Sequence, residues 1–97
     1  MFIISLTYKT EIANVEPHMA GHMAFLETCY QQGVFLASGR KVPRTGGVIL
    51  ANADSREALE SILQQDPFCV EDLVDMDITE IQVSKTAPGL EGLLDLA

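Results

Sequence analysis

Apolar and polar residues alternate near the start of the chain, which is the period of a β-strand with one buried face. The apolar positions of this pattern are Phe2, Ile4, Leu6 and Tyr8. Three further short apolar runs predict strands over residues 34–39, 48–51 and 76–83. Residues 41–47 contain one proline and two glycines, so we expect a loop there that joins the second and third strands as a hairpin.

Two segments between these strands have the apolar spacing of helices. The apolar positions of the first segment are Met19, Met23, Leu26 and Tyr30. We expect this helix to be capped by Asn14 and to end at Gln32, before Gly33. The apolar positions of the second segment are Ala58, Leu59, Ile62 and Leu63. Asp54 is its expected cap, and the Asp66-Pro67 pair is expected to end it, because proline disfavours helix at the residue before it.

The predicted order of elements is β-α-β-β-α-β, which is the ferredoxin-like plan of the α+β class. In this plan a four-stranded antiparallel sheet carries two helices on one face. The strands also have apolar residues on the other face, for example Ile3, which opposes Phe2 and Ile4. A chain of 97 residues has no helices left to cover that face, so we expect a second copy to do so in a homodimer.

Composition narrows the classes of function. The chain is long enough for one domain and 47 % of its residues are hydrophobic, so it can bury a core. Its formal net charge of −8 argues against nucleic acid as a partner. No stretch approaches the roughly 18 apolar residues of a membrane span, and the start of the chain lacks the features of a signal peptide. Two cysteines outside any C-x-x-C pair fit reduced thiols, so we expect a cytoplasmic protein.

His22 is the candidate residue that the pattern itself singles out. It lies three residues after Met19 and four before Leu26, on the apolar stripe of the first predicted helix. From the residues alone, a packed histidine bonded to a backbone carbonyl is favoured over a functional one. His18 lies four residues earlier, but no third metal ligand accompanies the pair. Cys29 lies in the middle of the same helix, where we expect a structural thiol rather than a nucleophile.

The chain resembles the YciI-like (YCII-related) family of the dimeric α+β barrel superfamily over roughly residues 1–84. The resemblance rests on four short segments in a fixed order. These segments are His22-Met23, Leu36-Ala37-Ser38-Gly39, Ser55-Arg56-Glu57-Ala58 and Asp66-Pro67-Phe68. Many members have proline after the glycine, where this chain has Arg40, and many have arginine shortly before the histidine. The remaining residues, 85–97, form a leucine-containing C-terminal tail outside the resemblance.

The resemblance implies a sheet-to-sheet dimer with one cleft per subunit, in which His22 and Asp66 match a histidine and an aspartate proposed as catalytic. A carboxylate on one ring nitrogen fixes the tautomer of a histidine and stabilises the imidazolium, so such a pair suits a general base. The alternative is structural, with Asp66 ending a helix and His22 packed in the core.

Polar residues at the strand ends are candidates for binding a substrate. Ser38 and Arg40 end the second predicted strand, and Tyr8 ends the first. A hydroxyl and a guanidinium there suit a carboxylate or phenolate oxygen. Arg40, Lys41 and Arg44 are close in sequence; they are either solvated or hold one anionic group of a small ligand.

The sequence therefore predicts a cofactor-independent enzyme that acts on a small organic molecule by general acid–base chemistry, as a lyase, isomerase or hydrolase. The pair expected to carry the reaction is His22 with Asp66. The alternative is a non-catalytic module that binds a small metabolite or forms part of a complex. A haem- or metal-using relative has little support beyond His18 and His22.

Overall fold

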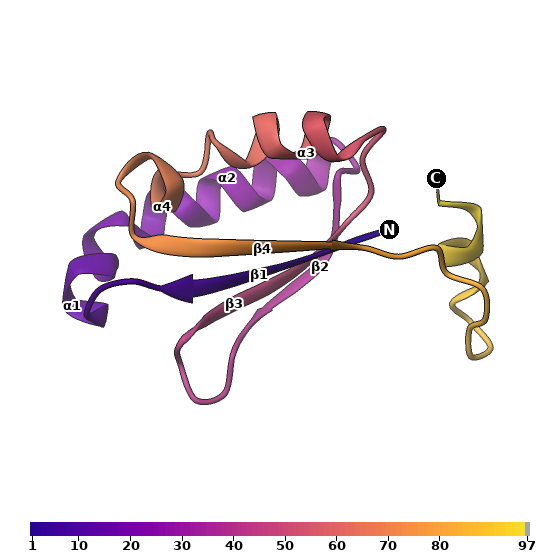
Figure 1. Cartoon of the computed structure of the whole chain (residues 1–97), viewed down its shortest axis with the longest axis horizontal. Helices are drawn as coiled ribbons and strands as arrows, with labels where there is room; N and C mark the ends of the chain where they lie inside the picture. The colour runs from indigo at the N-terminus through magenta and orange to yellow at the C-terminus, as the bar shows by residue number, and fades with distance from the viewer. Residues whose placement is uncertain (97) are drawn as a thin grey trace.

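The computed structural model describes residues 1–96 as a four-stranded antiparallel sheet with helices on one face (Figure 1). The elements, in chain order, are β1 (Phe2–Tyr8), α1 (Ile12–Val15), the 3₁₀ turn η1 (Glu16–His18), α2 (Met19–Gln31), β2 (Phe35–Arg40), β3 (Gly46–Ala51), α3 (Arg56–Leu63), α4 (Pro67–Val70), β4 (Val74–Glu80) and the 3₁₀ turn η2 (Glu91–Asp95). The strand order is β2-β3-β1-β4, and all neighbours are antiparallel. The predicted ferredoxin-like α+β fold is confirmed.

The register of the sheet decides which residues face the helices. Ile4 of β1 pairs with Ile49 of β3 and Ile78 of β4, and these three positions share one face. Ile4 and Ile49 are almost completely buried. They belong to one core, which continues into the buried faces of α2, α3 and α4.

The first helical segment begins earlier than expected, and the prediction of Asn14 as its cap is wrong. Helix starts at Ile12, and the Asn14 side chain instead donates a hydrogen bond to the Thr10 hydroxyl at 2.8 Å. Pro17 lies in the 3₁₀ turn η1, which separates α1 from α2. Because proline has no N–H to donate, the chain changes its hydrogen-bond pattern there. α2 then ends as expected before Gly33, whose φ of +75° suits a glycine.

The second half of the chain differs from the prediction in two caps. Ser55, not Asp54, caps α3, since its hydroxyl accepts a hydrogen bond from the Ala58 N–H at 3.0 Å. Asp66 lies after the end of α3 and caps α4, the next short helix. A proline at the first position of a helix loses no bond, so Asp66-Pro67 both stops one helix and starts another.

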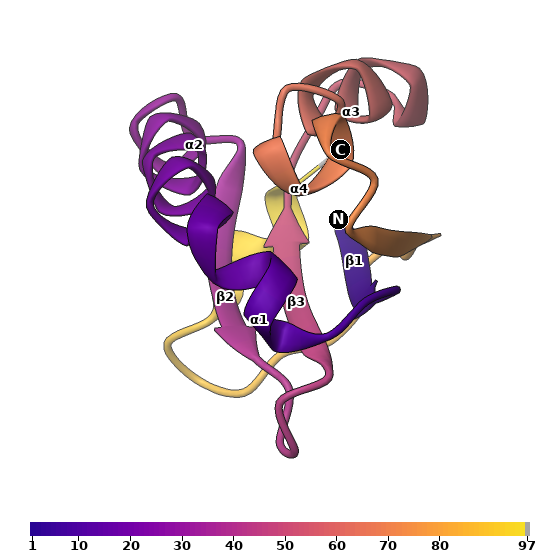
Figure 2. The same cartoon turned by 90° about the vertical axis from the view of Figure 1, so that its left-hand side faces the viewer.

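The face of the sheet opposite the helices is open within the described residues. Figure 2 shows α2, α3 and α4 together on one side of the sheet. On the other side Ile3, Val48 and Leu50 are half-buried, and Asp75 and Asp77 of β4 are exposed. This arrangement fits the expected homodimer, which remains a prediction.

The C-terminal segment lies beyond the end of β4, away from the helices (Figure 1). It forms the short turn η2. Leu90 and Leu94 are 53 % and 44 % exposed, so this turn does not join the core. The domain boundary predicted at residue 84 remains a prediction. Among residues 1–96, no helix is both long enough and apolar enough to cross a membrane.

Candidate active site

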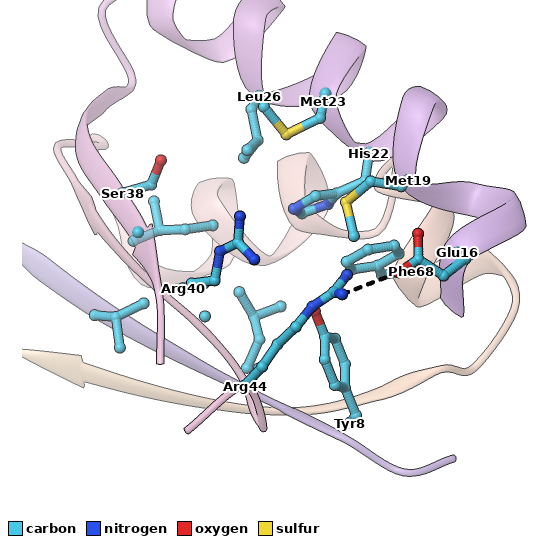
Figure 3. Close-up of a pocket in the computed structure, with 16 residues that line it drawn as sticks. Tyr8, Glu16, Met19, His22, Met23, Leu26, Ser38, Arg40, Arg44 and Phe68 are labelled. Atoms are coloured by element: carbon cyan, nitrogen blue, oxygen red, sulfur yellow. Dashed lines mark hydrogen bonds and ion pairs between the residues drawn. The ribbon is translucent and has the colours of Figure 1, made fainter. Parts of the chain in front are cut away.

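A cleft of about 540 Å³ lies between α2 and the β1–β3 part of the sheet, a size typical of small-molecule sites (Figure 3). Met19, His22 and Met23 line it from α2, and Ser38 and Arg40 line it from β2. The apolar positions Met19 and Met23 therefore line the cleft. Met23 is 55 % exposed, and its thioether lies at the cleft.

His22 and Asp66 meet at the inner wall of this cleft. Nδ1 of His22 lies 2.9 Å from both carboxylate oxygens of Asp66. Asp66 is 0 % exposed and His22 is 9 % exposed, and they are the buried polar or charged residues of the described chain. One oxygen of Asp66 also accepts the Phe68 N–H at 2.9 Å. The carboxylate is thus held by a ring N–H and a backbone N–H, as a buried charge requires.

This geometry selects the tautomer of His22. Because Asp66 accepts from Nδ1, the neutral ring carries its proton there and leaves the lone pair on Nε2. Nε2 has no hydrogen-bond partner among residues 1–96, yet no buried side-chain nitrogen or oxygen of these residues is unsatisfied. Nε2 therefore reaches the accessible space of the cleft.

Aromatic packing fixes the orientation of the imidazole. The His22 ring stacks on Phe68 with centroids 3.9 Å apart and an angle of 5° between planes. Tyr8 meets the same phenyl ring edge-on at 6.2 Å. Phe68 follows Asp66 by two residues, so α4 supplies both the carboxylate and the stacking ring. In the sequence Phe68 is noticeable only as the last residue of the Asp66-Pro67-Phe68 segment, and its contact with His22 has no local signal.

Gly21 allows α2 and α4 to approach closely enough for this contact. A Cβ at Gly21 would lie 3.1 Å from Cγ of Pro67, closer than ordinary van der Waals contact. Glycine inside a helix costs up to about 1 kcal/mol relative to alanine, and here it removes the atom that would separate the helices. The next residue is His22, so this approach sets the distance between the two members of the pair.

The other residues proposed from the sequence also reach the cleft. Ser38, Arg40 and Tyr8 all line it, although they come from different strands. The Ser38 hydroxyl shares a hydrogen bond with the Tyr30 hydroxyl of α2. The bond links β2 to α2 across the end of the cleft, and it could not be found from sequence spacing.

The three cations of residues 40–44 have different surroundings. Arg44 donates to the Glu16 carboxylate at 2.9 Å, and this hydrogen bond, followed by one to the Tyr8 hydroxyl, raises the pKa of Arg44 (Figure 3). Lys41 donates to the Thr7 hydroxyl at 3.0 Å and does not line the cleft. The Arg40 side chain lines the cleft and has no hydrogen bond or ion pair with any described residue. Glu16 was not identified from the sequence.

The thiols do not suit nucleophilic catalysis. Cys29 is 2 % exposed, and burial, followed by the charge of Asp66, raises its pKa. The same two causes raise the pKa of Cys69 to about 11. A thiol that stays protonated is a poor nucleophile. Within residues 1–96, no three histidine, cysteine or acidic side chains lie together in a way that could hold a metal ion.

The chain is compared with known proteins both by fold and by sequence. A solved structure of 5-chloro-2-hydroxyhydroquinone dehydrochlorinase from Burkholderia phenoliruptrix, in complex with 2,5-dihydroxybenzoquinone, is similar with a TM-score of 0.73. The identity is 19 %, and the match covers 86 % of this chain and 94 % of the other. No curated protein matched by sequence. A model of the YCII-related domain matches residues 1–82, so the chain belongs to the YCII-related family.

Proposed function

We propose that the protein is an enzyme that moves protons on a small organic molecule, with His22 as general base and Asp66 as its positioning residue. One observation carries the proposal. His22 donates a hydrogen bond from Nδ1–H to a completely buried carboxylate and leaves Nε2 free at the wall of a ligand-sized cleft. The lone pair of Nε2 is thereby directed to the space where a small molecule would bind.

The reaction follows from this arrangement. Nε2 takes a proton from an acidic C–H or O–H of the bound molecule, and Asp66 stabilises the imidazolium that forms. The electron pair released from the broken bond becomes an enolate or a new double bond. In an elimination it expels a leaving group with its bonding electrons; in an isomerisation the imidazolium returns the proton elsewhere on the same molecule. Both are lyase or isomerase chemistry, and hydrolysis through an activated water is the remaining outcome.

Three side chains would contact the substrate in this proposal. The Ser38 hydroxyl, the Arg40 guanidinium and the Tyr8 hydroxyl line the same cleft as His22. Leu26 and Met23 supply an apolar wall for a ring or short chain. The similar structure of a dehydrochlorinase supports an enzyme on this fold, because that protein holds a small cyclic molecule.

Turnover of a defined panel tests the proposal. Wild-type protein is incubated with a mixture of small cyclic and α-acidic carbonyl compounds, including 5-chloro-2-hydroxyhydroquinone, and consumption is followed by NMR in D₂O. We expect deuterium incorporation or loss of a leaving group in at least one compound. His22→Gln should reduce the rate by a factor of 10² or more, the range that a general base contributes. Thr28→Ala, an exposed change on the same helix, is the matched control.

Two results would contradict the proposal. Undiminished turnover by folded His22→Gln protein would show that His22 is not the general base. Ligand binding without any turnover by wild type would favour the alternative, a non-catalytic module for a small metabolite. Circular dichroism and thermal unfolding of each variant separate loss of chemistry from loss of fold.

The proposal includes a homodimer formed through the open face of the sheet. Ile3, Val48 and Leu50 lie on that face without helices over them, and burial of apolar area is the main driving force for association. Sedimentation at micromolar concentration should give twice the 10.6 kDa mass of one chain. A single-chain mass would disprove this part.

A further inference from the structure

The charged groups around the cleft differ in whether they have a partner within the protein. Two carboxylates and two guanidiniums lie in or beneath its wall, in a chain with a net charge of −8. Glu16 is already bonded to Arg44, and Asp66 is bonded to the His22 ring and the Phe68 N–H. Every carboxylate of the site therefore has its donors. Arg40 alone among these cations has no counter-ion within the described residues.

The backbone explains why Arg40 and not Lys41 faces the cleft. Arg40 pairs with Gly47, and Gly47 in turn faces Leu6, so these positions share the helix side of the sheet. Side chains alternate along an extended chain, and Lys41 instead reaches Thr7 on the other side. In Figure 3 the Arg40 guanidinium extends into the cleft between Ser38 and Arg44, toward the wall that carries His22.

We infer that the cleft selects molecules with one negative charge on a planar group, a carboxylate or an ionised enol, and that Arg40 is the residue that selects them. A guanidinium binds such groups through two parallel hydrogen bonds. One free cation balances one charge, and the acidic chain disfavours a second. The inference rests on the proposed function only in taking this cleft as the substrate site.

The ion pair between Arg44 and Glu16 leaves Arg40 as the cation that can bind a ligand. Their ion pair crosses from the β2–β3 loop to η1 at one end of the cleft, so Arg44 is not available to a ligand unless Glu16 releases it. The Ser38 hydroxyl, which is bonded to Tyr30, lines the same cleft as Arg40. An anionic group held at Arg40 lets the uncharged part of the molecule lie against Met23 and Leu26, facing His22.

Matched probes test this inference without knowledge of the natural substrate. Benzoate and benzamide have nearly the same shape and differ in charge, and phenyl phosphate carries more than one charge near pH 8. Each is titrated into ¹⁵N-labelled full-length protein, and dissociation constants are read from amide shifts around the cleft. We expect benzoate to bind at least tenfold more tightly than benzamide, and more tightly than phenyl phosphate.

Variants identify which positive charge binds the carboxylate of benzoate. Arg40→Met should weaken benzoate about tenfold, which is 1.4 kcal/mol, and should leave benzamide unchanged. Arg40→Lys should recover part of the loss, and Lys41→Met, outside the cleft, should have no effect. Glu16→Gln should strengthen benzoate several-fold, because it frees Arg44. Equal binding of benzoate and benzamide, tighter binding of phenyl phosphate, or unchanged benzoate binding by Arg40→Met would overturn the inference.

Each of the two proposals can be contradicted without affecting the other. His22→Gln should abolish turnover but keep the preference for benzoate, since it removes no positive charge from Arg40. If benzoate binds through Arg40 and nothing is turned over, the anion site stands and the enzyme proposal falls. If a neutral compound is turned over through His22 and benzoate does not bind, the reverse holds.

Discussion

The two walls of the cleft are built in opposite ways. The inner wall, His22 with Asp66 on Phe68, lies in the core, and each polar atom there has a partner or reaches the cleft. The outer wall, Ser38 and Arg40 on β2, is exposed, and its guanidinium has no partner among described residues. The difference separates two tasks. The inner wall belongs to the fold as much as to the site, whereas the outer wall can change its ligand without disturbing the fold.

Removal of the buried carboxylate should have the largest effect. Asp66→Ala leaves the His22 Nδ1–H and the Phe68 N–H buried without an acceptor and removes the cap of α4. We expect a loss of about 3 kcal/mol in the free energy of unfolding, measured by urea denaturation. Glu60→Ala, which breaks an exposed pair with Arg56, should cost under about 0.5 kcal/mol. Similar losses in both variants would contradict the distinction between the walls.

Crowding of the contact between α2 and α4 should have an intermediate effect on stability. Gly21→Ala improves helix propensity by up to about 1 kcal/mol, but its Cβ would lie 3.1 Å from the Pro67 ring. We expect the clash to outweigh the gain by about 1 kcal/mol and to lower turnover by displacing His22 from Asp66. Gly92→Ala, which has open space around it, is the control. A more stable Gly21→Ala protein with unchanged turnover would show that the approach does not position the pair.

The raised pKa of the Cys69 thiol, near the inner wall, should make the stability of the protein depend on pH. Burial and then the charge of Asp66 raise its pKa from 9.0 to about 11. Between pH 9 and 11 the unfolded chain therefore loses this proton before the folded one, so the folded state loses stability as pH rises through that window. The urea midpoint of wild type relative to Cys69→Ala should fall there and stay constant below pH 8. Parallel curves across the whole range would contradict the raised pKa.

The outer wall should give the smallest change in stability. Arg40 is exposed and unpaired within residues 1–96, so Arg40→Met should alter the free energy of unfolding by no more than about 0.5 kcal/mol. Thermal unfolding of the variant checks this. A large loss would mean that Arg40 supports the fold, and the comparison between the walls would no longer hold.

Periodicity was sufficient for the order of elements, because strands and helices bury one face at periods that can be seen in the sequence. The caps were less predictable. Asn14 and Asp54 have the right chemistry for a cap. However, Asn14 lies inside α1 and bonds to Thr10, and the neighbouring Ser55 caps α3 in place of Asp54. Periodicity singled out His22, whereas Asp66 was identified through a family resemblance, and their contact remained a hypothesis until the structure placed them 2.9 Å apart.

The sequence by itself determined the ferredoxin-like order, the apolar stripe that carries His22, and the closeness of Arg40, Lys41 and Arg44. Tertiary structure alone decided which of these cations is free, because their partners, Thr7 and Glu16, lie on elements distant in the chain. It also decided the tautomer of His22, because the carboxylate is 44 residues away. Contacts between distant segments depend on register and helix packing, which no local pattern encodes.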